Sequence, residues 1–133
     1  MLKIKVKIGK SSIQGIGLFA DQFIPKGTTT WRYEQNLDIS ITKEEIEALP
    51  ELSKQFVLYY SYFDKKMEYY VLPTDHLRFI NHTSNKEKLN IDSTPDEDVA
   101  SRDIQAGEEL LCDYNKFDDT YFDRIGLNDK DLV

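Results

Sequence analysis

The segment RFINHT at residues 78–83 places an amide, Asn81, beside an imidazole, His82, directly after an apolar stretch. Further along the chain, the segment GEELLCDY at residues 107–114 ends an apolar run with an aspartate and a tyrosine, Tyr114. Taken alone, Asn81 and His82 can simply satisfy the hydrogen bonds of a loop. The segments that precede them decide between this structural interpretation and a functional one.

Two earlier segments have the composition of strands. GIGLFA at residues 15–20 has two glycines ahead of an apolar run, and TTTWRY at residues 28–33 is β-branched and aromatic. The chain begins with MLKIKVKI, in which apolar residues alternate with lysines. This alternation predicts a half-buried strand over residues 2–8, which Gly9 and the polar residues after it end.

A weak internal similarity links residues 20–33 with residues 100–114. Each segment has an alanine, an isoleucine four positions later, a glycine three positions after that, and a tyrosine at the end of the next strand. The pattern predicts two hairpins of one design, each presenting a tyrosine, although I-x-x-G is also a common turn. The matching positions are Ala20, Ile24 and Gly27 in the first segment and Ala100, Ile104 and Gly107 in the second.

A helical insert is expected over residues 42–62. The sequence TKEE at residues 42–45 has the form of a capping box, which predicts a short helix after it. Pro50 interrupts this helix and is expected to be the first residue of a second one. In the second helix Leu52, Phe56 and Tyr60 are spaced to share one face.

The remaining segments predict further short strands and an aromatic tail. Residues 62–63 and 69–72 read as two strands around a turn, an acidic loop covers residues 92–98, and a strand-turn-strand spans residues 99–114. The alternation of strands with long helices that builds a doubly wound sheet is missing. The sequence therefore predicts one mostly β domain over residues 1–133, with a small helical insert.

Length and composition bound the class of protein. A chain of 133 residues makes one domain, and 40% hydrophobic with 12% aromatic residues is a globular composition. The single cysteine, Cys112, excludes an internal disulfide framework and cysteine-based zinc modules. No apolar run is long enough to span a membrane, and one free thiol suits a reducing compartment. We therefore expect a soluble, intracellular protein of the cytoplasm.

The charge is unevenly distributed along the chain. Residues 1–66 carry 10 basic and 8 acidic side chains, whereas residues 67–133 carry 7 basic and 16 acidic ones, for a total of -7. A phosphate backbone is an improbable partner for such a chain, because nucleic-acid binding depends on Lys and Arg. A basic partner is favoured by the electrostatic field. The acidity also has the plainer interpretation that it keeps the protein in solution.

Several chemistries are excluded or disfavoured by the residues present. Gly15 and Gly17 lack the third glycine of a dinucleotide-binding loop, and the acidic ribose partner expected further on is missing. His76 and His82 have neither of the spacings that place two ligands on one helix face, so no metal site is predicted. No G-x-S-x-G motif occurs, and Cys112 lies in an apolar strand, where a buried, inert thiol is expected.

Taken together, four segments resemble SET-domain protein methyltransferases. In family order they are GIGLFA at 15–20, the aromatic strand at 31–33, RFINHT at 78–83 and GEELLCDY at 107–114. The chain is similar to small stand-alone members without flanking zinc-binding segments, with a core over about residues 5–115. The resemblance implies several short sheets and a pseudoknot in which the segment at 81–82 and the final strand thread past each other.

The resemblance implies an S-adenosylmethionine-dependent protein-lysine N-methyltransferase. Such an enzyme transfers the methyl group directly to a lysine of a basic protein or tail, releases S-adenosylhomocysteine and uses no metal. A lysine-containing basic protein would be the partner, without direct nucleic-acid or membrane binding, and a minimal domain could dimerise to complete its substrate groove. The alternatives are a catalytically inactive SET-like protein-binding module and a structural β domain with coincidental motifs.

The family pattern also implies site residues. Tyr114 would be the channel tyrosine, which positions the substrate and does not deprotonate it, and Tyr33 would line the lysine channel. We further hypothesise that residues 116–133 close the cofactor site through three aromatic side chains, although these can also only pack on the core. The expected cofactor-binding residues are Gly15, Ile16, Gly17, Arg78, Ile80, Asn81, His82, Tyr114, Phe117, Tyr121 and Phe122.

The sequence departs from the family pattern in three places. Tyr33 is followed by Glu34 and Gln35 where the family has a Y-x-G motif, and the segment after His82 is longer than usual. The aromatic residue expected shortly after Asn90 is not evident. That residue often tunes how many methyl groups are added, so the resemblance leaves the product open.

Overall fold

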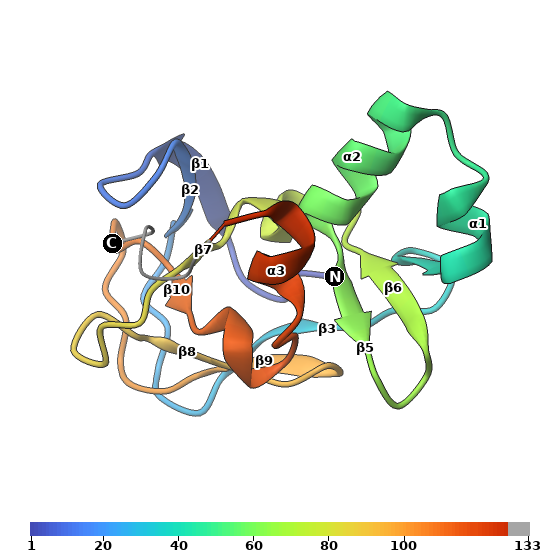
Figure 1. The fold of residues 1–133 in the computed structure, drawn as a ribbon. Helices are drawn as coiled ribbons and strands as arrows, with labels where there is room; N and C mark the ends of the chain where they lie inside the picture. The colour runs from blue at the N-terminus through green and yellow to red at the C-terminus, as the bar shows by residue number, and fades with distance from the viewer. Residues whose placement is uncertain (128–133) are drawn as a thin grey trace.

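The computed structural model describes residues 1–127, in which the strands form four small sheets (Figure 1). Strand β1 (Val6–Lys10) pairs antiparallel with β2 (Ile16–Ala20), and Gly9 lies opposite Gly17. The expectation that Gly9 ends the first strand is therefore wrong. The glycine is tolerated inside the strand because its partner strand also carries a glycine at that point. Leu2 forms an isolated bridge to Trp31 instead of extending β1.

The second sheet has three strands in the order β3-β9-β8. Its strands are β3 (Thr29–Arg32), β9 (Glu97–Ala100) and β8 (Ile91–Ser93), and both pairings are antiparallel. Trp31, Asp98 and Ser93 stand in one row across the sheet, and all three are buried. Directly paired residues project from the same face of a sheet. This row therefore points a tryptophan, a carboxylate and a hydroxyl toward the interior.

The two similar segments found in the sequence pair with each other and do not fold as separate hairpins. Ile24 and Ile104 exchange both backbone hydrogen bonds at 2.8 Å, and both side chains are completely buried. Gly27 and Gly107 adopt φ values of 86° and 93°, which a side chain would strain, and each donates to the alanine of the other segment. The shared pattern thus encodes one twofold-like junction between distant parts of the chain.

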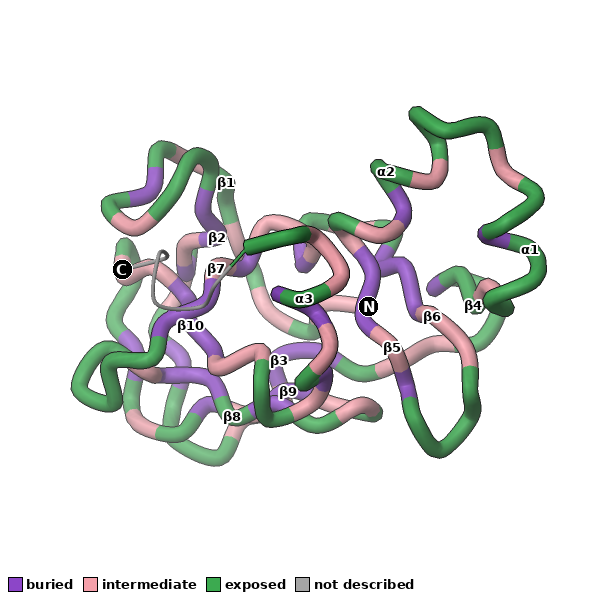
Figure 2. The backbone as a smooth tube through the Cα atoms, in the orientation of Figure 1, coloured by how far each residue is buried: buried purple, intermediate pink, exposed green. Residues whose placement is uncertain are grey.

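The helical insert lies between two strands of a third sheet, in which β4 (Ile39–Thr42) and β5 (Tyr62–Asp64) flank β6 (Tyr69–Leu72). Helix α1 (Lys43–Glu47) begins at the predicted capping box on Thr42, and α2 (Glu51–Tyr60) follows Pro50, which is the N-cap and not the first helical residue. The insert projects from the rest of the molecule, and Figure 2 shows most of it exposed.

The predicted apolar face of the second helix is not its buried face. Leu52 is 80% exposed and Phe56 44%, whereas Val57 is buried against Ile46 and Leu72. The short insert has only this small cluster to pack on, so only one turn of α2 reaches it. The spacing of Leu52 and Phe56 marked a common face correctly but could not identify what covers it.

The last sheet pairs β7 (Asn81–His82) in parallel with β10 (Leu111–Cys112). On its other side, β10 is held by Asn90, whose side chain accepts from Leu111 N at 2.8 Å and donates to Glu109 O at 2.8 Å. Asn90 is 1% exposed, so these bonds are shielded from water. The chain from residue 81 to residue 90 thus forms hydrogen bonds to both edges of the final strand, as the expected pseudoknot requires.

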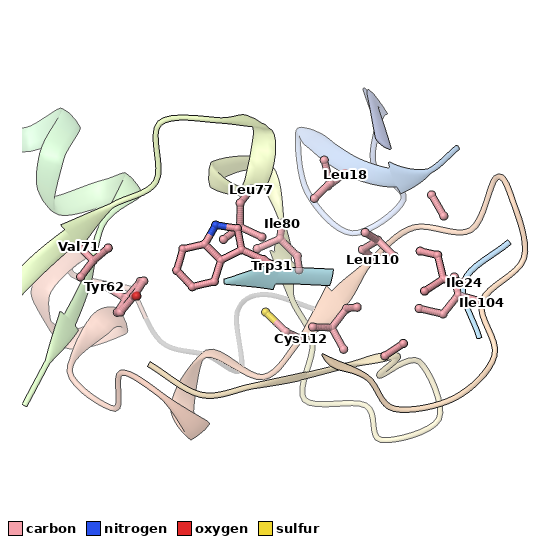
Figure 3. Packing of buried hydrophobic residues seen from close by; sticks show 13 residues of the cluster. Leu18, Ile24, Trp31, Tyr62, Val71, Leu77, Ile80, Ile104, Leu110 and Cys112 are labelled. Atoms are coloured by element: carbon pink, nitrogen blue, oxygen red, sulfur yellow. The ribbon is translucent and has the colours of Figure 1, made fainter. Parts of the chain in front are cut away.

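The main core joins all four sheets. Figure 3 shows Trp31 in the middle of this cluster, with Tyr62 and Val71 to one side and Ile24 and Leu110 to the other. Three short helical segments complete the described chain: η1 (His76–Phe79), η2 (Tyr114–Lys116) and α3 (Tyr121–Ile125). Together with α2 and β7, they surround the cavity described next.

Candidate functional site

A cavity of about 300 Å³ brings together segments from every part of the chain. One group of lining residues, called the Asn81 end, comprises residues 14–16, before and at the start of β2, and Asn81, which bonds to them. A second group, called the Asp98 end, comprises Tyr62, Ser93, Asp98 and Cys112. Tyr114 also lines the cavity, so the motif residues of two distant segments meet there.

At the first end, the Asn81 side chain is fixed by three acceptors. Its Nδ2 atom lies 3.1 Å from Gln14 O, 3.1 Å from Ile16 O and 3.1 Å from Glu109 Oε1. Because all three partners are acceptors, the amide nitrogen must face them. The amide oxygen is then the atom turned to the other side, where it can accept a hydrogen bond.

Glu109 supports Asn81 and explains Gly17. Its Oε1 atom also accepts a hydrogen bond from Ser11 Oγ at 2.6 Å, which ties the loop before β2 to the segment before β10. A Cβ atom at Gly17 would lie 2.3 Å from this oxygen, closer than any real contact. Gly17 is thus required for the approach of the carboxylate. Gly15, with φ of 52°, and Ile16 line the cavity themselves.

His82 links the two motifs. Its Nδ1 atom accepts a hydrogen bond from Tyr114 N at 3.0 Å and lies 3.6 Å from Asp113 Oδ1. The Tyr114 hydroxyl donates to Ile80 O. Burial raises the pKa of Tyr114 well above its ordinary value, so the phenol is neutral at physiological pH.

The C-terminal aromatic residues lie on the cavity side of the core. Phe117 and Tyr121 line the cavity, and their rings meet Tyr114 at 5.8 Å and 5.0 Å. Phe122 is buried behind them, stacked on Tyr114 at 5.9 Å and against His82 at 4.9 Å. The aromatic residues of the predicted closing segment 116–133 thus pack beside the cavity, and its residues 128–133 lie outside the described part of the chain.

The Asp98 end of the cavity contains an aromatic ring and a carboxyl group. Tyr62 meets Phe117 edge to face at 5.5 Å, and its hydroxyl donates to Pro95 O at 2.6 Å. Burial raises the pKa of Asp98 to about 7, although the Ser93 hydroxyl beside it acts in the opposite direction. Burial likewise raises the pKa of the Cys112 thiol, which is a poor nucleophile in this state.

Three other predicted residues have definite positions. Arg78 lines the cavity, but its guanidinium donates to Pro73 O at 2.8 Å and 3.3 Å and is not turned freely toward a ligand. Ile80 presents the carbonyl that Tyr114 binds. Tyr33 follows β3, and its hydroxyl lies 2.8 Å from Ser40 Oγ on β4; it is not among the residues that line the cavity.

Sequence reasoning missed Glu109, Tyr62 and Asp98 as residues of this site. Glu109 lies inside the quoted motif GEELLCDY, so its position was visible, but its role depends on a contact with the distant Asn81. Asp98 carried a signal that was not used: it is a carboxylate at an inward position of the short strand β9. Inward polar residues of strands usually have a partner or a function.

Neither a metal cluster nor a membrane-spanning helix occurs in the described residues. Within residues 1–127, no group of three or more His, Cys, Asp or Glu side chains is placed to hold a metal ion. No helix in this part of the chain is long and apolar enough to cross a membrane.

Comparison with protein-family models gives one match. The model of the SET domain matches residues 15–115, which include both cavity ends and both motifs. No curated protein matches the chain.

Solved structures with the same fold include two sets of histone methyltransferase relatives. The Chaetomium thermophilum Polycomb Repressive Complex 2 bound to S-adenosylmethionine matches with 26% identity and a TM-score of 0.63, over 86% of this chain and 16% of that chain. A Plasmodium falciparum candidate histone methyltransferase matches with 25% identity and a TM-score of 0.58, over 85% of this chain and 95% of that one. The chain thus spans a small fraction of the Polycomb chains and nearly the whole Plasmodium chain.

Proposed function

Because the chain belongs to the SET-domain family, we propose that it is an S-adenosylmethionine-dependent protein-lysine N-methyltransferase. The observation that carries the proposal is the meeting of Asn81, His82 and Tyr114 at one cavity, with Asn81 held by three acceptors. Three acceptors fix the amide nitrogen of Asn81 and leave its oxygen as the atom that could accept from a ligand, which supports the proposal.

In this proposal, the Asn81 end of the cavity holds the methionine part of S-adenosylmethionine. That part carries an α-ammonium and a sulfonium, both cationic. The Asn81 amide oxygen can accept from the ammonium, and the Glu109 carboxylate behind it contributes a favourable negative field. When bound, the cofactor supplies a methyl group on a positively charged sulfur.

The protein's part in the reaction is alignment and desolvation. The lysine must lose one proton before its nitrogen lone pair attacks the methyl carbon, while the carbon–sulfur bond pair leaves with sulfur. From a reference pKa near 10.4, this deprotonation costs about 4.6 kcal/mol at pH 7. A dry aromatic channel and the nearby sulfonium charge lower that cost. Solvent accepts the proton, so no strong protein base is required.

Tyr114 positions the reacting groups in this proposal. Its raised pKa makes it a neutral hydrogen-bond donor, and its hydroxyl already binds Ile80 O beside the cavity. The rings of Tyr62 and Phe117 provide an apolar wall for the alkyl part of the lysine. Alignment of two bound reactants is one of the largest sources of rate enhancement.

The substrate is proposed to be a lysine in a basic, flexible protein segment. The acidic second half of the chain would attract such a segment over distances of about the Debye length. The structural relatives include a Polycomb complex solved with histone H3 peptides, which suggests histone-like tails as first probes. The rate of an attracted substrate is expected to fall as salt is raised.

Methyl transfer to a panel of basic peptides tests the proposal. The chain is incubated with S-adenosylmethionine and histone tail peptides, and mass spectrometry follows both the peptide and S-adenosylhomocysteine. Methylated lysine, with loss of signal in Asn81→Ala, is the expected result. Binding of the cofactor without transfer to any basic peptide or protein would instead identify the inactive SET-like module.

A further inference from the structure

Asp98 is a buried carboxylate that lines the same cavity as Asn81. It lies in the row of Trp31, Asp98 and Ser93 on the buried face of the three-stranded sheet, is 5% exposed and lines the cavity. A carboxylate buried to this extent is expected to have a cationic or hydrogen-bonding partner, because desolvation of the charge is costly.

No cationic partner for Asp98 comes from the described chain. Within residues 1–127, Asp98 forms no ion pair, and the Ser93 hydroxyl beside it is a neutral group that only partly offsets the effect of burial on its pKa. The other charged groups lining the cavity are engaged: Arg78 binds Pro73 O, and Asp118 pairs with Arg124 at 3.0 Å. Asp98 is therefore the carboxylate of the cavity that is left for a ligand.

Aromatic rings line the same cavity as this carboxylate. Tyr62, Phe117 and Tyr114 all line the cavity, and their rings contact one another edge to face at 5.5 Å and 5.8 Å. Aromatic faces attract alkylammonium groups, and a carboxylate adds a hydrogen-bond acceptor for any N–H that the ammonium retains. The combination complements an amine that still carries hydrogen atoms.

We propose that Asp98 accepts the N–H groups of the substrate lysine and thereby restricts the enzyme to lower methylation states. The inference rests on the proposed function. With its N–H groups directed to Asp98, the nitrogen would keep its lone pair on the side away from this carboxylate, available to the methyl group of the cofactor. An unmethylated ammonium offers three N–H donors, a dimethylated one offers a single donor, and a trimethylated one offers none.

The transfer remains balanced with Asp98 in this role. The ammonium releases one proton to solvent, the nitrogen forms its bond to the methyl carbon, and sulfur keeps the electron pair of the broken bond. Each cycle replaces one N–H by a methyl group, so the acceptor at Asp98 loses a donor with each turn. We therefore expect monomethyl-lysine as the main product.

Variants of Asp98 test this role against a merely structural one. Asp98→Leu removes the acceptor at similar volume, Asp98→Asn keeps one acceptor oxygen, and Glu97→Gln is the matched control on the same strand, where the carboxylate instead pairs with Arg32 at 3.2 Å. Peptides with unmethylated, monomethylated and dimethylated lysine are compared, and the affinity for S-adenosylmethionine is measured separately.

Loss of one charge-assisted hydrogen bond should lower kcat/KM for the unmethylated peptide by about 10-fold or more in Asp98→Leu, mainly through KM. In the same variant, kcat/KM for the dimethylated peptide should fall less, and the affinity for S-adenosylmethionine should stay unchanged. Glu97→Gln should behave as the wild type. Equal preference among the three peptides in wild type and Asp98→Leu would overturn the inference.

A binding experiment without turnover separates this inference from the proposed function. n-Butylammonium and n-butyltrimethylammonium are titrated into the protein, and NMR follows the signals of Cys112 and Tyr62. The wild type should bind the first more tightly, and Asp98→Leu should lose that preference. Absence of any preference in the wild type would contradict the role of Asp98 even if methyl transfer occurs, whereas a preference without methyl transfer would contradict only the enzyme.

Discussion

The two ends of the cavity differ in how their polar groups are satisfied. At the Asn81 end, each polar side chain has partners within the protein: Asn81 has three acceptors, and Glu109 receives two donors. At the Asp98 end, Asp98 is buried without an ion pair among residues 1–127. Internal hydrogen bonds preorganise the Asn81 end, whereas the carboxylate at the Asp98 end has no cationic partner.

This difference suggests two ways of building a ligand site. A network whose hydrogen bonds are already formed fixes one amide oxygen before binding, so little conformational entropy of this side chain is lost when the ligand binds. A buried carboxylate without a cationic partner instead destabilises the free protein, and binding of a cation relieves this cost. Variants at the two ends should therefore move stability and affinity in opposite directions.

The largest effect is expected on stability, from Asp98→Asn. Burial raises the pKa of Asp98 from 3.8 to about 7, so between these values the unfolded chain releases a proton that the folded chain retains. Stability is therefore lost as the pH rises from about 4 to about 7, by at most about 4 kcal/mol. Chemical denaturation at pH 4.5 and 8 should show Asp98→Asn more stable than the wild type at pH 8 and nearly equal to it at pH 4.5. A wild type whose advantage grows with pH would contradict an unpartnered Asp98.

The second effect is expected on cofactor affinity, from Gly17→Ala. The new Cβ would lie 2.3 Å from Glu109 Oε1, which must then leave Asn81 and Ser11. Loss of two hydrogen bonds to a charged group predicts about 100-fold weaker binding of S-adenosylmethionine by calorimetry. Gly9→Ala is the matched control, because its Cβ meets only the ring of Phe19 at 3.4 Å. Equal affinities of the two variants would exclude the Glu109 contact as the cause.

The smallest effect separates the two roles of Glu109. Glu109→Gln keeps an oxygen that can accept from both Asn81 and Ser11, so binding of S-adenosylmethionine should weaken by only about 3-fold, through the lost charge. Glu109→Ala removes the acceptor of both hydrogen bonds and should weaken it about 100-fold, as Gly17→Ala does. The same calorimetric titration measures both variants. If Gln and Ala reduce affinity equally, the charge and not the orientation of Asn81 is what matters.

The Asn81 end could largely be predicted from the sequence, and the Asp98 end could not. Asn81, His82 and Tyr114 lie in short motifs, and the pattern shared by residues 20–33 and 100–114 pointed to two segments that in fact pair through Ile24 and Ile104. Local spacing specifies such features, because each motif carries its own turn or strand.

Features that depend on tertiary packing were missed. Leu52 and Phe56 share a helix face, but the spacing alone gives no information on whether that face is covered. Tyr33 matches the position of a channel aromatic residue in the family pattern, yet its hydroxyl bonds to Ser40 and it does not line the cavity. Tyr62 instead contributes an aromatic ring to the cavity lining. Asp98 needed the sheet register to be placed beside Ser93 and Trp31. Sequence-distant pairing decides all of these positions.

Thermal unfolding with and without S-adenosylmethionine, on the wild type and on Asn81→Ala, tests the central claim most directly. Cofactor at 100 times its Kd adds about 2.7 kcal/mol to the folded state. For a chain of this size that should raise Tm by several degrees, on the order of 3–6 °C per kcal/mol. We predict a clear rise in the wild type that disappears in Asn81→Ala. An unchanged Tm of the wild type at millimolar cofactor would contradict the assignment of this cavity to S-adenosylmethionine.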